Sequence, residues 1–169
     1  MKIEFRITSQ LLKKIHEQLS IPHPFAAERV GFISCGIAKL PENNLLVLGE
    51  SFLSVKDADY INNPNFGAMM NSSAIRKALQ FSYKHRRAIF HVHRHEHKGI
   101  PQFSSIDLRE SAKFIPNFWN VQPNLPHGII VVSHDSMAGL CWHPNHDELI
   151  SIDQFSIIQQ AASKARWIA

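Results

Sequence analysis

The stretch FHVHRHEHKGIPQFSSIDLRE, residues 90–110, carries four histidines within seven positions and then a Ser-x-x-Asp. Side chains alternate between the two faces of a strand, so His91 and His93 share one face of the short strand-like run that contains them. Ser104 and Asp107 are three positions apart in an expected first helical turn, which also puts them on one face. The two imidazoles and the carboxylate form a ligand set that zinc accepts.

Three protein ligands leave one position of a tetrahedral zinc open, which is typical of catalytic rather than structural sites. Other zinc motifs fail on spacing. The chain has no Cys-x-x-Cys, and HEH at 95–97 lacks the second histidine of His-Glu-x-x-His. The nucleobase-deaminase signature needs a downstream Pro-Cys-x-x-Cys, which is also missing. A solvated histidine-rich loop beside a helix cap remains the alternative, and a second element elsewhere must decide.

Length and composition favour one folded domain spanning residues 1–169. A hydrophobic content of 44% supports one buried core, and a charged content of 19% argues against disorder. The sequence has no apolar run long enough to span a bilayer and no signal peptide at its start, which predicts a cytoplasmic protein. The net charge of +4 is modest and forms no basic stripe with interleaved aromatics, so neither nucleic acid nor a membrane is expected as a partner.

Hydrophobic periodicity predicts strands and helices in alternation, with hairpins turning at PENN (41–44) and HDS (134–136). Strands are expected at 3–7, 29–40, 44–55, 88–93, 128–133 and 137–143, helices at 9–19, 72–86, 104–115 and 153–168, and a long loop at 56–70. This order predicts an α+β protein, a mixed curved β-sheet layered with helices.

The second element is ERVGFISCG at residues 28–36. With it, the chain resembles the JAMM/MPN⁺ (JAB domain) zinc metalloproteases. Their signature is a glutamate that opens an early strand, followed by His-x-His, a loop and Ser-x-x-Asp. Glu28, Gly31 and Gly36 match the upstream piece, and the order of elements matches over most of the chain. The resemblance implies a single MPN/JAB-like domain that binds one Zn²⁺ per chain.

The resemblance also implies a role for each residue of the motif. His91, His93 and Asp107 correspond to the zinc ligands. Glu28 corresponds to the general base that takes a proton from the attacking water and passes it to the leaving amine. Ser104 corresponds to the donor that stabilises the tetrahedral oxyanion.

Two departures from the family pattern concern the histidine loop. More residues separate His93 from Ser104 than is common in the family, and Arg94 stands where a proline often follows the second histidine. The longer loop leaves a rival register in which His93 and His95 are the ligands. The 91/93 register is preferred because the apolar run AIF directly precedes His91. His95 and His97 are then expected to be solvated loop residues.

By resemblance, the function is cleavage after the C-terminal glycine of a ubiquitin-like protein, for deconjugation or precursor processing. Small bacterial deubiquitinase-like members act beside ubiquitin-like conjugation pathways, so the partners implied are a modifier with an extended Gly-ended tail and its activating and conjugating enzymes. The 56–70 loop is the candidate cover for that tail, although it could equally be a linker. Its expected substrate contacts are Tyr60, Phe66, Met69 and Met70.

Two other functions stay open. One is a non-catalytic MPN-like module that binds a ubiquitin-like partner without cutting it. The other is a zinc amidohydrolase that acts on a small substrate.

Overall fold

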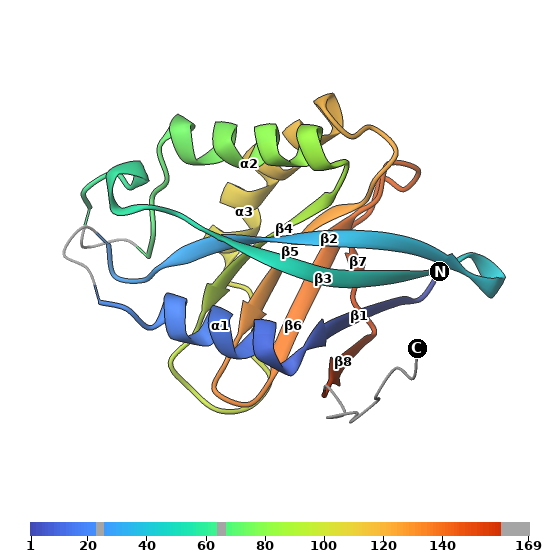
Figure 1. Cartoon of the computed structure of the whole chain (residues 1–169), viewed down its shortest axis with the longest axis horizontal. Coiled ribbons are helices and arrows are strands. Elements are labelled where there is room, and N and C mark those ends of the chain that lie inside the picture. The colour runs from blue at the N-terminus through green and yellow to red at the C-terminus, as the bar shows by residue number, and fades with distance from the viewer. Residues whose placement is uncertain (23–25, 64–66, 160–169) are drawn as a thin grey trace, which may run out of the picture.

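The computed structural model describes residues 1–22, 26–63 and 67–159, which form one eight-stranded sheet and three α-helices (Figure 1). The strands are β1 (Ile3–Thr8), β2 (Val30–Leu40), β3 (Asn44–Ser54), β4 (Ala88–Arg94), β5 (His127–Val132), β6 (Met137–Trp142), β7 (Ile150–Ser151) and β8 (Gln154–Ile158). The α-helices are α1 (Ser9–Leu19), α2 (Ser72–His85) and α3 (Ser105–Phe114), and short 3₁₀ helices span Pro41–Asn43, Asp57–Asp59 and Ile115–Asn120.

The sheet is mixed and curled, with the strand order β7-β6-β5-β4-β2-β3-β1-β8. β2 lies antiparallel between β3 and β4, whereas β4 and β5 run parallel. Two residues, Ile152 and Asp153, connect the strands at the two ends of this order. The Ile152 N–H donates to Gly139 O of β6 (3.0 Å), and the Asp153 N–H donates to Ile3 O of β1 (2.9 Å). The curl therefore brings the two ends of the sheet together.

Helices cover both faces of the sheet (Figure 1). One core contains Ile15 and Leu19 of α1 with Phe90 and Val92 of β4. The other contains residues of α2 and α3 with Ile89 of β4. The alternation expected along β4 is thus confirmed: even positions face α1, and odd positions face α2 and α3.

The strands and helices expected from residue 3 to residue 143 are confirmed, as are both hairpins. The helix expected at 153–168 is wrong, because residues 154–158 form β8; residues 160–169 lie outside the described part. β8 pairs parallel with β1, with Phe155 opposite Phe5. The sequence QFSII is rich in residues that favour strands, and pairing with the open edge of β1 decides its conformation. The expected 56–70 loop contains the 3₁₀ turn Asp57–Asp59 and a bridge between Tyr60 and Met70.

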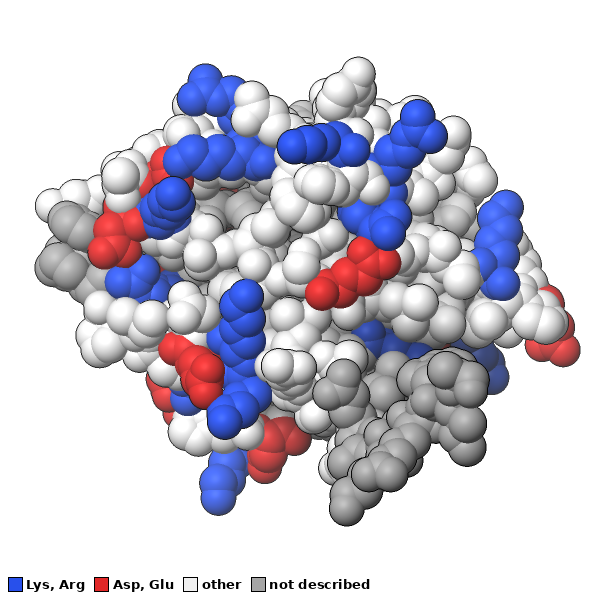
Figure 2. Space-filling model, viewed as in Figure 1, with Lys and Arg blue, Asp and Glu red and all other residues white. Residues whose placement is uncertain are grey.

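On the face shown in Figure 2, basic and acidic side chains are interspersed, and several of the Lys and Arg side chains lie along α2. None of the helices in the described residues combines the length and apolar character needed to cross a membrane.

Candidate metal centre

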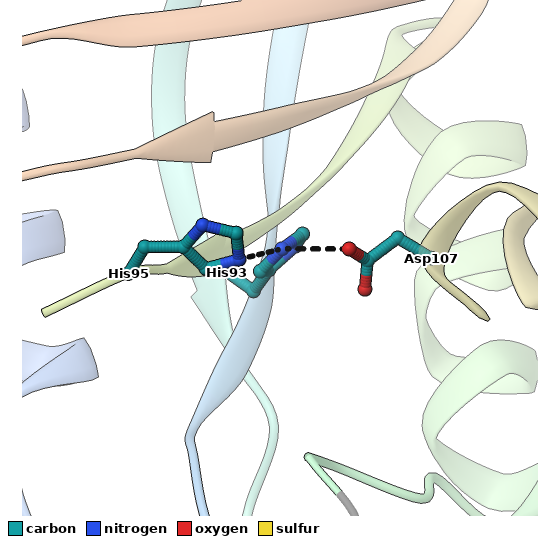
Figure 3. Close-up of side chains that lie close together, drawn as sticks. All are labelled: His93, His95 and Asp107. Atoms are coloured by element: carbon teal, nitrogen blue, oxygen red, sulfur yellow. Dashed lines mark hydrogen bonds and ion pairs between the residues drawn. The ribbon is translucent and has the colours of Figure 1, made fainter. Parts of the chain in front are cut away.

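The end of β4 and the first turn of α3 bring two imidazoles and a carboxylate together (Figure 3). The Nε2 atoms of His93 and His95 are 3.2 Å apart, and His93 Nε2 is 3.7 Å from Asp107 Oδ2. When one donor atom is taken from each of His93, His95 and Asp107, these three atoms all lie within 4.8 Å of one another. This group could hold a metal ion.

His91 lies on the same face of β4, two residues before His93. Its ring packs at 5.5 Å from Phe32 and 5.4 Å from Phe114, and its centroid is 6.1 Å from that of His93. Among the described residues, no hydrogen-bond partner reaches its buried Nε2 atom. A buried nitrogen without a partner is costly, which makes His91 a further candidate donor, although it lies outside the compact group of three.

Burial keeps the strand histidines neutral. It lowers the pKa of His91 to about 3, with a further contribution from His93. It lowers the pKa of His93 to about 4, against the opposing effect of Asp107. A metal ligand must present a free nitrogen lone pair, and both imidazoles meet this condition at neutral pH.

Asp107 is held in place by a capping box at the start of α3. Its Oδ2 accepts hydrogen bonds from the backbone N–H and the hydroxyl of Ser104, both at 2.7 Å. The Asp107 N–H donates in return to Ser104 Oγ at 3.1 Å. Ser104 therefore begins the helix and orients the carboxylate, and its hydroxyl proton points at Asp107.

Loss of this cap gives a first prediction. Ser104→Ala is expected to lower the free energy of unfolding by about 1 kcal/mol, the usual value of an N-cap side chain. Urea unfolding of the metal-free protein measures the change. Ser105→Ala is the matched control, because Ser105 is an exposed residue one position further on. Equal stability of Ser104→Ala and Ser105→Ala would contradict the assigned cap.

Glu28 lies just before β2, is half-buried and is close enough to Asp107 for that carboxylate to affect its pKa. Its N–H donates to Gly67 O at 2.9 Å, and a Cβ at position 67 would collide with Glu28 Oε1. Gly67 thus leaves the space that the carboxylate fills. Burial, and secondarily the negative charge of Asp107, raises the pKa of Glu28 to about 7. A carboxyl group with this pKa can accept and release a proton near neutral pH.

The raised pKa predicts a pH-dependent stability. In the unfolded chain the pKa of Glu28 has its ordinary value of 4.5, whereas burial raises it to about 7 in the folded protein, so rising pH favours the unfolded state across that window. Relative to Glu28→Gln, the metal-free protein is expected to lose about 2–3 kcal/mol between pH 4.5 and 7.5. Urea unfolding in a chelator at several pH values measures the difference. A pH-independent difference would contradict the raised pKa, and the exposed Glu17→Gln serves as control.

The positions of the expected site residues differ in one respect from the sequence analysis. His93 and Asp107 meet, with Glu28 nearby, but the third member of the compact group is His95 rather than His91. The expectation that His95 is a solvated loop residue is wrong. It is half-buried against His93, whereas His97 is exposed as expected. The sequence did contain a signal for this position of His95, because residues 91, 93 and 95 follow the two-residue alternation of one strand face.

The expected substrate contacts have different surroundings. Tyr60 is 7% exposed, and its hydroxyl accepts from Val30 N (2.9 Å) and donates to Val30 O (3.2 Å). It therefore fixes the 56–70 loop to the start of β2. Met69 is 41% exposed and Met70 is half-buried. Phe66 lies outside the described residues.

No family model matches the chain, and no curated protein matches it significantly.

Proposed function

We propose that the chain is a zinc-dependent isopeptidase or peptidase of the JAMM type, which cleaves after the C-terminal glycine of a ubiquitin-like protein. The observation that carries the proposal is the juxtaposition of a histidine–aspartate group with the half-buried Glu28, whose pKa is raised to about 7. Metal ligands and a proton-transfer group are the two parts that metal-assisted amide hydrolysis requires.

The donor set favours zinc among the common metals. Imidazole nitrogens with one carboxylate oxygen are typical zinc ligands, whereas Mg²⁺ and Ca²⁺ prefer oxygen ligands. His91, His93, His95 and Asp107 are the available donors. When bound, zinc supplies Lewis acidity that activates water and polarises the substrate carbonyl.

The protein's own groups carry the proton. Glu28 accepts a proton from the attacking water as the bond from oxygen to the carbonyl carbon forms. It then delivers that proton to the amine nitrogen as the C–N bond breaks, so the reaction yields a carboxylic acid and an amine, which are present as carboxylate and ammonium at neutral pH. Ser104 is proposed to donate to the tetrahedral oxyanion, for which its hydroxyl must turn away from Asp107.

The arrangement of elements supports the proposed MPN/JAB-like fold. The glutamate precedes β2, the histidines lie at the end of β4 next to β2, and the aspartate comes from the first turn of α3. This is the order of the family signature, and His93 and Asp107 lie close together at the end of β4. The bacterial, ubiquitin-like pathway proposed for the chain rests on the resemblance.

The proposal is tested with zinc-loaded protein and three kinds of substrate. These are linear fusions of ubiquitin-fold proteins that end in Gly-Gly, the same modifiers linked to a lysine side chain, and small acyl amides. Cleavage directly after the terminal glycine, lost with a chelator and restored by zinc, is the expected result. Cleavage of the small amides alone would favour a zinc amidohydrolase. Zinc-dependent binding of modifiers without cleavage by any variant would favour a non-catalytic module.

Substrate capture by the 56–70 loop gives a further prediction. Met69→Ser is expected to raise KM for a modifier fusion roughly tenfold with little change in kcat, because an apolar contact worth about 1–2 kcal/mol is lost. The matched control is Tyr83→Ser, which alters another exposed apolar side chain, on α2. Steady-state kinetics measures both variants. An unchanged KM for Met69→Ser would leave the loop without a role in binding.

A further inference from the structure

We propose that His95 completes a four-ligand zinc site with His91, His93 and Asp107, so that the protein's own side chains close the metal centre at rest. The proposal rests on the proposed function for the identity of the metal. The proposal adds His95 as a ligand that a three-ligand catalytic site does not need. This extra ligand would restrain hydrolysis.

The spacing of the ring nitrogens supports a shared metal. Ligand nitrogens about 2.0–2.1 Å from a tetrahedral zinc lie about 3.3 Å apart. The 3.2 Å between the Nε2 atoms of His93 and His95 matches this separation. The 3.7 Å from His93 Nε2 to Asp107 Oδ2 is close to it, and a small side-chain rotation shortens it. His93 stands between the other two donors in Figure 3.

His91 supplies the independent observation. Its Nε2 is buried and, among the described residues, has no partner. The His91 ring lies outside the compact group of three donors, with its centroid 6.1 Å from that of His93, so it must turn toward His93 to reach the same metal. An unsatisfied buried nitrogen costs about 1–3 kcal/mol, and coordination would remove that cost. The alternation 91, 93, 95 delivers three imidazoles to one side of the sheet, and α3 delivers the carboxylate.

The backbone around His95 is anchored. The His95 N–H donates to Val132 O at 2.8 Å, and further along the loop the His134 N–H donates to His97 O at 2.9 Å. The Gly99 N–H donates to Asp135 Oδ1 at 2.7 Å. The loop is thus fixed to the end of β5 and to the turn that follows, which holds the His95 ring over His93. With the backbone anchored in this way, rotation of the His95 side chain is the simplest way for it to leave the metal.

Closure has a chemical consequence. Four protein ligands fill a tetrahedral zinc, as in structural sites, and leave no position for water or a substrate carbonyl. Turnover by the proposed enzyme then requires His95 to move aside. His95 therefore acts as a brake on hydrolysis and at the same time strengthens zinc binding.

X-ray absorption at the zinc edge of the loaded protein counts imidazole ligands directly. Three imidazole ligands are expected for the wild type and two for His95→Ala. The zinc affinity of His95→Ala should also fall by roughly 10–100-fold or more, because losing even a residue that only supports a ligand lowers affinity to that extent. His95→Phe keeps an aromatic ring but has no nitrogen to bind the metal, so this variant should also show two imidazole ligands. His97→Ala is the control from the same loop and should keep three. Two imidazoles in the wild type, or an unchanged number in His95→Ala, would overturn the proposal.

Kinetics tests the brake separately. At saturating zinc, His95→Ala is expected to cleave a modifier fusion several-fold faster than the wild type, while His97→Ala matches the wild type. Slower cleavage by fully loaded His95→Ala would overturn the closure. If no variant cleaves any modifier while the imidazole number still falls from three to two, the proposed function fails but His95 remains a ligand.

Discussion

Glu28→Gln is expected to lower turnover of a modifier fusion by about 10²–10⁴-fold without loss of zinc, which is the usual contribution of a positioned general base. Glutamine keeps the size of the side chain and removes its ability to accept a proton. The backbone bond from the Glu28 N–H to Gly67 O is retained, so the start of β2 should stay in place. Single-turnover kinetics, elemental analysis and a melting curve measure the three quantities.

Asp107→Asn is the contrasting variant. It weakens a ligand rather than a base, so zinc content and activity should fall together. Its amide also loses acceptor strength toward the Ser104 N–H and hydroxyl, which should loosen the first turn of α3. Loss of zinc from Glu28→Gln would instead make Glu28 a ligand. Undiminished turnover in that variant would remove Glu28 from the chemistry.

The part of the fold that follows from local pattern could be predicted from the sequence. Strict alternation along β4 separates Ile89 from Phe90, and the apolar spacing of α1 places Ile15 and Leu19 in the core. Thr8 and Ser104 mark helix starts because their side chains accept from N–H groups in the first turn. These features depend on neighbours within a few residues, which the sequence displays directly.

Two features depend on contacts between distant segments and were predicted wrongly. β8 is a strand because its residues pair with β1, about 150 positions away in the chain, as Phe155 does with Phe5. His95 is half-buried because Val132 and the turn after β5 hold its loop against the sheet. Neither contact can be deduced from local composition. The departure in loop length between His93 and Ser104 was visible, but its effect on His95 was not.

His93→Ala is expected to abolish activity through loss of the metal. His93 is 3% exposed and lies between His95 and Asp107, so its removal takes away the central donor of the group (Figure 3). A ligand bound only by the folded state at 100 times its Kd stabilises a protein by about 2.7 kcal/mol. Zinc should therefore raise the Tm of the wild type by roughly 5–10 °C. The same addition should leave the Tm of His93→Ala nearly unchanged.

His127→Ala separates this effect from the general cost of removing a buried histidine. Like His93, His127 is buried, and burial lowers its pKa to about 4. However, its Nδ1 accepts from the Ile89 N–H at 3.1 Å, and its ring stacks on Phe118. Its role is thus structural, and His127→Ala should lose stability in the metal-free state but keep the zinc-dependent rise in Tm. Of these two buried imidazoles, only that of His93 has a ring nitrogen directed at the other candidate ligands. If zinc raised the Tm of His93→Ala as much as that of His127→Ala, the metal would therefore have to bind elsewhere.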